Sequence, residues 1–396
     1  MKKIKLLPMI LLSLFATSTW IQAADPKGDM KLNPLENGVP FLTIAPDARG
    51  GGMGDIGAAT DPDVNSQYWN PAKYAFAYSK AGVSLSYTPW LRQLVNDIDL
   101  VYLSGFYKLG NEDRHAIGAS LRYFSLGSIP LTALGANGQP EFLGEANPNE
   151  FALDLSYSLK LTETFSGAAA IRFIYSDMGA GTVEGLFAGK AFAADVAGYY
   201  NNYVMMGSNE CMLGLGFNIS NIGTKISYDN GIRNLFLPTN LRLGASFLFP
   251  MDDYNTLSIN ADVNKYLVPT PPDLEGLDQA EKERLQQEYE AISPITGIFK
   301  SFSDAPGGMK EELREVMWSL GAEYAYDNKF FVRGGYFYEH PTKGNRQYFS
   351  LGAGFKLTSF QMDVAYLIST VPSNPLDQTL RFSLSFDMDG LKGLMQ

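Results

Sequence analysis

The feature that most constrains this chain is a series of short segments in which apolar and polar residues alternate. In the clearest segment, 346–357, Phe349 and Leu351 fall on one face, while Tyr348 and Ser350 fall on the other. Alternation with a period of two is typical of a β-strand. A tilted strand of about 12 residues is long enough to cross the hydrocarbon core of a membrane. One face of each segment therefore suits lipid and the other suits water.

Fourteen such segments follow one another along the chain. They are 80–89, 97–109, 114–126, 150–160, 164–177, 189–200, 211–220, 238–249, 254–266, 315–326, 329–339, 346–357, 358–369 and 377–388. An even number of strands is typical of a bacterial single-chain barrel, and a closed barrel satisfies every backbone polar group in lipid. We therefore expect an all-β fold, a 14-stranded antiparallel transmembrane β-barrel over residues 79–390.

The connections between these segments alternate between long and short. Barrels of this kind have short periplasmic turns and long extracellular loops. With a periplasmic N-terminal side, the long extracellular loops are 90–96, 127–149, 178–188, 221–237, 267–314, 340–345 and 370–376, and among the inner turns only 201–210 has any length. Unrelated β segments would not alternate in this way, so the pattern supports the barrel independently.

The N-terminus has the features of a secretory signal peptide. Lys2, Lys3 and Lys5 lie at the start of an apolar run that ends near Phe15, and Ile21-Gln22-Ala23 precedes Ala24. This arrangement predicts export with cleavage after that alanine. We expect residues 1–23 to be the signal peptide and the mature chain to reach the outer membrane of a Gram-negative envelope.

Composition excludes several function classes. The formal net charge of −11 makes nucleic acid a poor partner. Cys211 is the one cysteine, which excludes an internal disulfide framework and cysteine-based metal sites. His115 and His340 are the two histidines, and each lies beside a strand end where a surface position is expected. We therefore predict no metal site, no cofactor and no catalytic residue.

The segment between the signal peptide and the barrel, residues 24–78, is predicted to be a plug. Its central part, 41–76, is dense in Gly, Pro and Asp and has no sustained period, so it should be irregular or briefly helical. It nevertheless contains large apolar residues, namely Phe41, Ile44, Met53, Ile56, Tyr68 and Trp69. A solvated tail would not contain so many. We expect this segment to lie in the lumen of the barrel.

Two short motifs define the plug segment. The first is Arg49, Gly50, Gly51, Gly52 and Gly54, which could be a phosphate-binding loop or a backbone packed closely against a wall. No Gly-Lys-Ser/Thr follows and no buried strand precedes it, so close packing is favoured. In that interpretation, Arg49 pairs with a lumen carboxylate. Asp154, Asp262 and Asp363 are examples of such a carboxylate.

The second plug motif is Trp69-Asn70-Pro71. Asparagine before proline is a turn signal, and the large aromatic residue beside it needs a pocket. We expect the wall of the barrel to supply that pocket.

The polar faces of the segments contain charges of both signs. They are Lys108, Arg122, Asp154, Arg172, Arg242, Asp262, Glu323, Arg333, Lys356, Asp363 and Arg381. Such charges are expected in a hydrated or plugged lumen. An acid–base site is the competing interpretation, and pairing of these charges with one another is favoured over it.

Several predicted outer loops contain clustered apolar residues. They are Trp90, Leu91, Leu94, Leu235, Phe236, Leu237, Ile298, Phe299 and Phe302. Exposed apolar clusters often mark partner or ligand surfaces. The alternative is that these residues fold back as a lid over the lumen, and the sequence does not favour either. Loop 267–314 also contains an acidic helical pattern over 277–292.

At this point the residues resemble a known family. The stretch Pro46-Asp-Ala-Arg-Gly-Gly-Gly-Met-Gly54, followed by Asn65-Ser-Gln-Tyr-Trp-Asn-Pro-Ala-Lys-Tyr-Ala-Phe76 and then by a barrel, is similar to the PorV family of the type IX secretion system. This resemblance implies a protein without enzymatic activity that binds the C-terminal signal domain of secreted cargo. It also implies partners, which are a large outer-membrane translocon barrel, the cargo, a sortase-like attachment complex, and the lipid bilayer with its lipopolysaccharide.

A more distant resemblance leaves an alternative open. The Asn70-Pro71-Ala72 turn ahead of fourteen strands is similar to the long-chain fatty-acid transporter family, which would imply transport of small hydrophobic compounds. The charged inner faces argue against a continuous apolar path. A third possibility is an outer-membrane enzyme acting on lipid, for which His340 beside Glu339 is the one hint. The secretion shuttle is the favoured interpretation.

Overall fold

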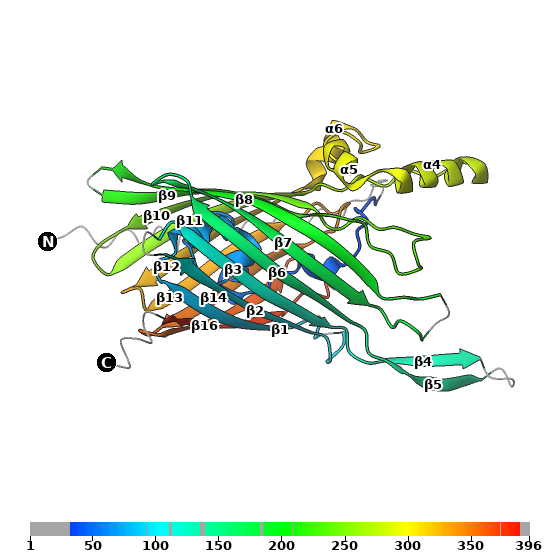
Figure 1. Ribbon diagram of the computed structural model, residues 1–396, viewed down its shortest axis with the longest axis horizontal. Helices are drawn as coiled ribbons and strands as arrows, with labels where there is room; N and C mark the ends of the chain where they lie inside the picture. The colour runs from blue at the N-terminus through cyan, green and yellow to red at the C-terminus, as the bar shows by residue number, and fades with distance from the viewer. Residues whose placement is uncertain are drawn as a thin grey trace. The chain divides into compact units, whose positions relative to one another are not determined.

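The protein forms a β-barrel in the computed structural model (Figure 1), which describes residues 32–92, 94–110, 113–134, 139–182, 185–207, 209–372 and 374–388. The expected signal peptide, residues 1–23, and the first residues of the expected plug lie outside this part.

Fourteen strands of the described chain form one closed antiparallel barrel. They are β1 (Ala81–Pro89), β2 (Asp99–Leu109), β3 (His115–Ser125), β6 (Asn149–Lys160), β7 (Phe165–Asp177), β8 (Gly189–Met206), β9 (Asn209–Gly223), β10 (Asn240–Pro250), β11 (Asn255–Tyr266), β12 (Val316–Tyr326), β13 (Phe330–Tyr338), β14 (Gln347–Lys356), β15 (Phe360–Ser369) and β16 (Leu380–Asp387). Each pairs with the next along the chain, and β1 closes the barrel on β16 with Leu85 opposite Leu384. The predicted fold class is confirmed, with one strand for each predicted segment.

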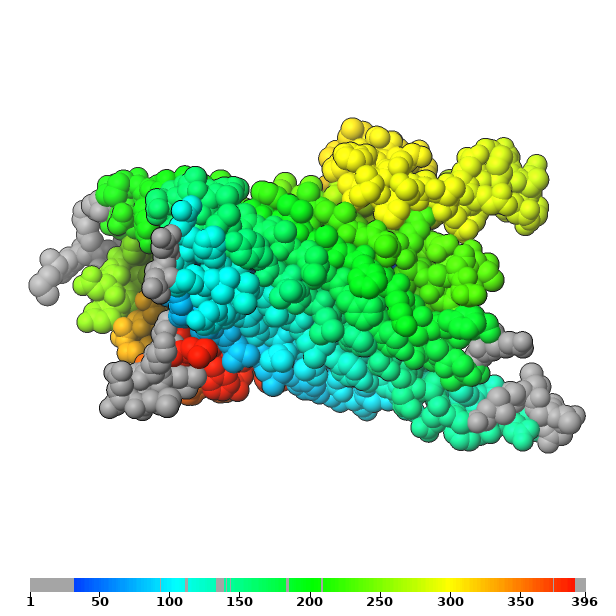
Figure 2. Space-filling view, in the orientation of Figure 1, coloured from blue at the N-terminus to red at the C-terminus, as the bar shows by residue number. Residues whose placement is uncertain are grey.

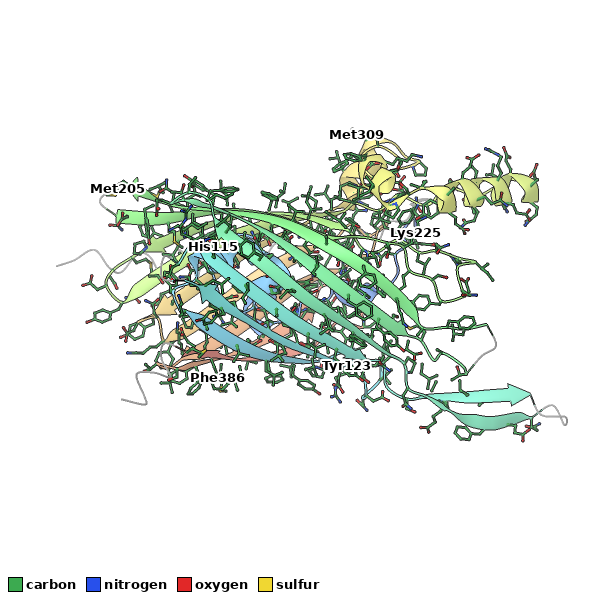
Figure 3. The ribbon with its side chains drawn as sticks, in the orientation of Figure 1. His115, Tyr123, Met205, Lys225, Met309 and Phe386 are labelled. Atoms are coloured by element: carbon green, nitrogen blue, oxygen red, sulfur yellow. The ribbon has the colours of Figure 1, made fainter. Side chains whose placement is uncertain are left out.

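The alternation of residues maps onto the two faces of the wall. In β14, Tyr348 and Ser350 are 3% and 1% exposed, whereas Phe349 and Leu351 are 54% and 57% exposed. Side chains stand outward along the strands, as Tyr123 and Phe386 do in Figure 3. The apolar outer face is the one that lipid covers in an outer-membrane barrel.

Two parts of the sheet differ from the sequence-based expectation. Residues 201–210 were expected to form an inner connection, but β8 and β9 continue through most of them, with Met206 opposite Asn209. Asn201 and Asn202 resemble turn residues, yet both are paired in the ladder, opposite Gly214 and Leu213.

The outer connection 127–149 contains a further hairpin that the sequence analysis missed. Strands β4 (Ile129–Leu134) and β5 (Pro140–Ala146) pair with each other as a separate two-stranded sheet, which extends beyond the barrel wall (Figure 1).

Long and short connections lie at opposite ends of the barrel. The short ones are 110–114, 161–164, 207–208, 251–254, 327–329 and 357–359, and the longest one at the other end is 267–315. Since inner turns of such barrels are short, we assign the end with the long connections to the outside.

Short helices occur in two regions of the described chain. The N-terminal region contains η1 (Pro40–Thr43), α2 (Ala48–Gly51), α3 (Ser66–Trp69) and η2 (Pro71–Phe76). The long outer loop contains α4 (Gln279–Ala291), α5 (Pro294–Lys300), α6 (Met309–Glu312) and η3 (Leu313–Glu315). No helix in the described part of the chain is both long enough and apolar enough to cross a bilayer.

The N-terminal region lies inside the barrel, where a plug was expected (Figure 1). Helix η2 contacts β3, β6, β7 and β8, and α2 contacts β14, β15 and β16. Several of its large side chains are almost fully buried, among them Phe41, Met53, Ile56, Trp69 and Tyr74. We call residues 33–78 the plug segment below.

Candidate functional site: the plug and the outer loops

The glycine motif places the plug backbone directly against the wall. Gly54 has a φ of +84°, and a Cβ atom there would lie 2.9 Å from the backbone nitrogen of Tyr336. A Cβ atom on Gly335 of β13 would lie 2.1 Å from the backbone carbonyl carbon of Met53. A side chain at either position would separate the two backbones. This geometry agrees with the close-packing interpretation of the motif.

The backbone amides of the same motif are not all free to bind a phosphate, as those of a phosphate-binding loop would be. The side chain of Asp47 caps α2, because its Oδ2 accepts a hydrogen bond from the backbone nitrogen of Gly50 at 2.9 Å. The other carboxylate oxygen, Oδ1, accepts one from the indole nitrogen of Trp69 at 2.5 Å. Asp47 therefore joins the two motifs of the plug segment.

Arg49 reaches a carboxylate of the wall, as expected, but a different one. Its guanidinium contacts Glu323 of β12 through two hydrogen bonds, of 3.2 Å and 3.0 Å. It also pairs with Asp63 within the plug segment, at 2.8 Å. Glu323 in turn binds Arg333 of β13, which binds Asp363 of β15. The plug is thus connected to a charged network that crosses several strands.

The three carboxylates named as partners of Arg49 were wrong, because each has another role. Asp154 pairs with Arg172 at 2.5 Å. Asp262 accepts hydrogen bonds from the backbone nitrogens of Gly57 and Ala58, at 2.9 Å and 3.0 Å. Asp363 pairs with Arg333, as described above. Asp262 therefore holds the plug through its backbone.

The second motif fastens the plug to the opposite side of the wall. The amide nitrogen of Asn70 donates to the backbone carbonyls of Ala58 and of Gly198 in β8, at 2.8 Å and 3.0 Å. The hydroxyl of Ser158 in β6 donates to the carbonyl of Pro71 at 2.6 Å. These contacts fix a segment that has few backbone hydrogen bonds of its own.

A third attachment point was not expected from the sequence. Asp55 pairs with Arg381 of β16 and accepts a hydrogen bond from the hydroxyl of Tyr348 in β14, each at 2.5 Å. Asp55 directly follows Gly54 of the first motif, and its φ is +60°. The sequence offers no signal for its role beyond its place next to that motif.

The plug segment separates two cavities, one at the outer end of the barrel and one at the inner end. The outer cavity, of about 310 Å³, has mostly apolar walls, formed in part by Phe41, Ile44, Trp90, Phe124, Leu367 and Leu376. The inner cavity, of about 520 Å³, is bordered by the charged network of Arg49, Glu323 and Arg333. Among the described residues, none lines both cavities.

The apolar residues of the first outer loop divide between two environments. Trp90 and Leu91 are half-buried and line the outer cavity, whereas Leu94 is exposed. In this loop the lid interpretation fits the first two residues, and the surface interpretation fits Leu94.

The apolar residues of the loop before β10 point inward. Phe236 and Leu237 are 5% and 3% exposed, and Leu235 is half-buried in a β-bridge with Ile226. The expectation that Phe236 and Leu237 present binding surface is therefore corrected. Their burial in the protein interior leaves no area for a partner unless the loop opens.

Phe236 anchors the long outer loop instead. Its ring packs edge-on against Tyr289 of α4, with ring centroids 5.7 Å apart. The ammonium of Lys225 lies 4.1 Å from the Phe236 ring centroid and donates to the carbonyl of Glu290 at 2.8 Å. Burial lowers the pKa of the Lys225 ammonium, and the charge of Glu290 opposes this shift. Two outer loops are thereby held together.

Buried ion pairs hold the other end of the long loop. Lys265 binds Glu312 and Glu315, and Lys343 binds Glu315 and Glu311, over distances of 2.5 to 3.1 Å. These contacts join α6 and η3 to the end of β11 and to the β13–β14 connection.

The long loop exposes a group of large apolar side chains on α5, on α6 and next to these anchors, which we call the outer knob. Its members are Ile295, Phe299, Phe302, Met309 and Leu313, which are 56%, 73%, 47%, 68% and 67% exposed. Figure 2 shows the helices that bear them, in yellow, projecting from one side of the barrel, and Met309 lies on this projection in Figure 3. The predicted residues Phe299 and Phe302 belong to the knob, and Ile298 beside them is half-buried.

Met309 and Leu313 are knob members that sequence analysis missed. Their spacing of four residues was an available signal, since residues i and i+4 share a helix face. Ile295 and Phe299 have the same spacing on α5.

Glu339 and His340, the pair that suggested an enzyme, make contacts with other residues. Glu339 pairs with Arg346 at 2.8 Å, while the Nδ1 atom of His340 contacts the hydroxyl of Thr342 at 2.9 Å. The two side chains therefore form no acid–base pair with each other.

Comparisons with known proteins bear on the family. Among solved structures, the Ralstonia pickettii toluene transporter TbuX is 14% identical, with a TM-score of 0.43, and covers 87% of this chain and 96% of its own. The Pseudomonas putida toluene transporter TodX is 11% identical, with a TM-score of 0.47, and the coverages are 90% and 99%. A Pseudomonas aeruginosa FadL homologue is 13% identical, with a TM-score of 0.42 and coverages of 87% and 98%.

Curated protein sequences gave no match to the chain. The sequence model of the family described as "Type IX secretion system protein PorV" matches residues 28–273, which include the plug segment and β1 to β11. This match spans more than half of the chain. The chain therefore belongs to the PorV family, whose members are outer-membrane proteins of the type IX secretion system.

Proposed function

We propose that this protein is a secretion shuttle that receives cargo from the translocon barrel of the type IX system. In this proposal it binds the C-terminal signal domain of the cargo and brings it to the sortase-like attachment complex at the cell surface. The protein itself performs no chemistry. Residues 1–23 are removed on export, and residues 24–78 close the barrel as a plug.

The outer knob is the observation that carries the proposal. Large apolar side chains on the outside of a protein cost free energy unless a partner or lipid covers them, and contiguous apolar patches mark interaction sites. Ile295 and Phe299 share one face of α5, and Phe302 lies two residues after the helix ends. Aromatic residues of this kind supply much of the energy of protein interfaces.

The anchoring of the long loop suits such a role. Phe236 and Tyr289 hold one side of the knob, and the ion pairs of Lys265 and Lys343 hold the other. A surface held in one arrangement loses less conformational entropy when it binds. Rigid anchoring would be unnecessary if these side chains only had to contact fluid lipid.

The proposal is tested by a double substitution, Phe299→Ala with Phe302→Ala, in the full-length protein. We expect co-purification with the translocon barrel or with cargo in mild detergent to fall by at least tenfold, since truncating a buried aromatic anchor costs ~2 kcal/mol or more. Mass spectrometry of the co-purified proteins identifies which partner is lost.

Phe349→Ala is the matched control, because Phe349 is a similarly exposed phenylalanine on the lipid-facing wall. Heat-modifiable gel mobility shows that each variant is folded. Equal losses in the knob variant and in the control would mean that the knob is only a lipid contact, and the proposal would then be withdrawn.

The outer cavity favours a second candidate function, the uptake of small hydrophobic compounds. Its apolar walls and volume of about 310 Å³ suit a small apolar molecule. Extraction of the purified protein followed by lipid mass spectrometry tests this function. A stoichiometric bound hydrophobic compound, together with normal cargo secretion by the knob variant, would favour transport over the shuttle.

A further inference from the structure

Most arginines in the barrel interior are neutralised by carboxylates. Five of them pair within 4.0 Å: Arg49 with Glu323 and Asp63, Arg172 with Asp154 and Asp195, Arg333 with Glu323 and Asp363, Arg346 with Glu339, and Arg381 with Asp55. Arg122 of β3 and Arg242 of β10 differ. In the part of the chain that the structure describes, neither has a carboxylate oxygen within that distance.

The contacts of these two arginines leave nitrogen atoms without a hydrogen-bond acceptor in the described structure. Arg122 donates from Nη1 to the backbone carbonyls of Phe41 and Leu42, at 3.3 Å and 2.9 Å. Arg242 donates from Nε to the side-chain oxygen of Asn264 at 2.9 Å. A guanidinium has five N–H donors, so several donors of each remain.

Both guanidinium groups lie against the same aromatic ring. Their central carbons are 4.5 Å and 5.1 Å from the ring centroid of Tyr68, for Arg122 and Arg242 respectively. Arg242 also lies 4.6 Å from the Trp69 ring. A ring face attracts a cation but does not neutralise its charge. The ring of Tyr68 is therefore a shared contact of two guanidinium groups that form no ion pair within the described residues.

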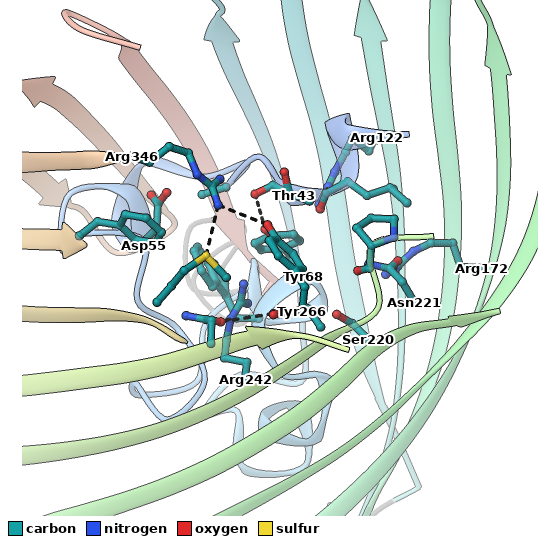
Figure 4. Close-up of a pocket in the computed structure, with 18 residues that line it drawn as sticks. Thr43, Asp55, Tyr68, Arg122, Arg172, Ser220, Asn221, Arg242, Tyr266 and Arg346 are labelled. Atoms are coloured by element: carbon teal, nitrogen blue, oxygen red, sulfur yellow. Dashed lines mark hydrogen bonds between the residues drawn. The ribbon is translucent and has the colours of Figure 1, made fainter. Parts of the chain in front are cut away.

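A separate cavity of about 50 Å³ lies at this point, and both arginines line it (Figure 4). It is polar as well as cationic, since Ser220, Asn221 and Asn240 also border it. One water molecule needs about 10 to 15 Å³ on this measure, so the space holds about three to five water-sized groups. That is the size of a small anion such as phosphate or acetate.

The acidic groups around the cavity make their hydrogen bonds to other partners. Asp55, which also lines the cavity, pairs with Arg381. Asp154 binds Arg172 and accepts from Ser120, and Asp262 accepts from the plug backbone. The charge of Asp262 also acts on Arg242, but no carboxylate oxygen of the described chain lies within 4.0 Å of that guanidinium, so its remaining N–H groups have no carboxylate acceptor.

We propose that this cavity is a binding site for one small anion, held between Arg122 and Arg242. The anion accepts the hydrogen bonds that the two arginines still offer, in the role that carboxylates have for the other interior arginines. Arg122 comes from the wall and holds the plug carbonyls of Phe41 and Leu42, so the bound anion also connects the plug to two strands.

The test is isothermal titration calorimetry of the full-length protein in detergent with inorganic phosphate, and separately with acetate, at constant ionic strength. We expect saturable binding of one anion per chain. Arg242→Gln should raise the dissociation constant at least tenfold. Arg233→Gln, which removes one positive charge from an exposed outer-loop pair, should leave it unchanged.

A second variant keeps the test decisive if Arg242→Gln does not fold. Asn264→Asp is isosteric and places a carboxylate beside the Nε atom of Arg242, so it should replace the anion and weaken phosphate and acetate binding at least tenfold while the barrel stays folded. Absence of saturable binding of either anion to the native protein, or unchanged affinity in a folded Asn264→Asp variant, would overturn the proposal.

Discussion

Arg49 of the plug and Glu323 of β12 face each other in the lumen with two hydrogen bonds, from Nε to Oε2 at 3.2 Å and from Nη2 to Oε1 at 3.0 Å. Their side chains are 12% and 10% exposed, so the pair is largely shielded from water. Glu323 also binds Arg333 of the wall. The contact that holds the plug is therefore part of the network that holds neighbouring strands together.

The first prediction is that Glu323→Ala loosens the plug. Removal of one partner from a buried ion pair typically costs ~3 to 5 kcal/mol, because the remaining charge is left without compensation. Arg49 would lose its wall contact but keep Asp63. We expect more frequent openings in single-channel recordings in planar bilayers, with Glu210→Ala, a substitution outside the network, as the control. Identical recordings for the variant and the native protein would show that this ion pair does not hold the plug.

The second prediction concerns the whole plug. Deletion of residues 41–72 should leave a folded barrel that conducts ions, because the strands pair with one another independently of the plug. Heat-modifiable mobility should show the folded barrel, and single-channel conductance should exceed that of the native protein. No gain in conductance would mean that something other than the plug segment closes the lumen.

The strands could be predicted from the sequence because the residues of each strand, taken alone, show that one face meets lipid and the other meets the lumen. Lipid and lumen impose opposite demands on successive residues, so the alternation in 346–357 is complete without any knowledge of neighbouring strands. The extension of β8 and β9 was missed where this signal weakens. Asn201 and Asn202 lie near the end of the wall, where neither face has to be apolar.

The partners of the plug could not be predicted in the same way. Arg49 was expected to pair with a lumen carboxylate, but the choice of Glu323 depends on which strand lies opposite α2 in the folded barrel. The burial of Phe236 could not be predicted from the sequence for a similar reason. An apolar loop residue can contact a partner or anchor another loop, and the anchor here, Tyr289, lies in a distant part of the sequence.

The third prediction is that Phe236→Ala releases the long outer loop. The substitution removes the ring that packs against Tyr289 and lies under Lys225. Truncation of a buried phenylalanine costs ~3 to 5 kcal/mol in a protein core, and the loss here falls mainly on the attachment of this loop. We expect faster cleavage within 267–314 by limited proteolysis, followed by mass spectrometry. Phe299→Ala, which removes an exposed ring, serves as the control and should be cleaved at the native rate.

The fourth prediction concerns pH and Asp304 in the long outer loop. Burial raises the pKa of the Asp304 carboxyl to about 6, with a smaller contribution from Glu312, while the hydrogen bond from the backbone nitrogen of Thr270 opposes the shift. A raised pKa means that the folded loop favours the protonated acid. The loop is therefore most stable below about pH 4 and loses stability as the pH rises to about 6, with no further change from this group above that.

Hydrogen exchange of residues 267–314, corrected for the intrinsic effect of pH, measures this dependence. Protection of the loop should fall between pH 4 and pH 6.5 in the native protein. Asp304→Asn removes the titrating group and should flatten that change. A variant that keeps the full pH dependence would assign it to another group.

The last prediction fixes the orientation of the barrel. Cys211 is buried at the inner end of β9, so it would resist a thiol reagent on either side of the membrane and must be replaced, by Cys211→Ser, before labelling. In that background, Gly276→Cys places a thiol in the long loop, and Asp253→Cys places one in the short β10–β11 turn. Both positions are exposed. If long connections face outward, a membrane-impermeant maleimide on intact cells should label position 276 and not position 253, whereas both should be labelled after the outer membrane is permeabilised. Labelling of position 253 alone on intact cells would reverse the orientation and place the outer knob in the periplasm, where it could not meet cargo at the cell surface.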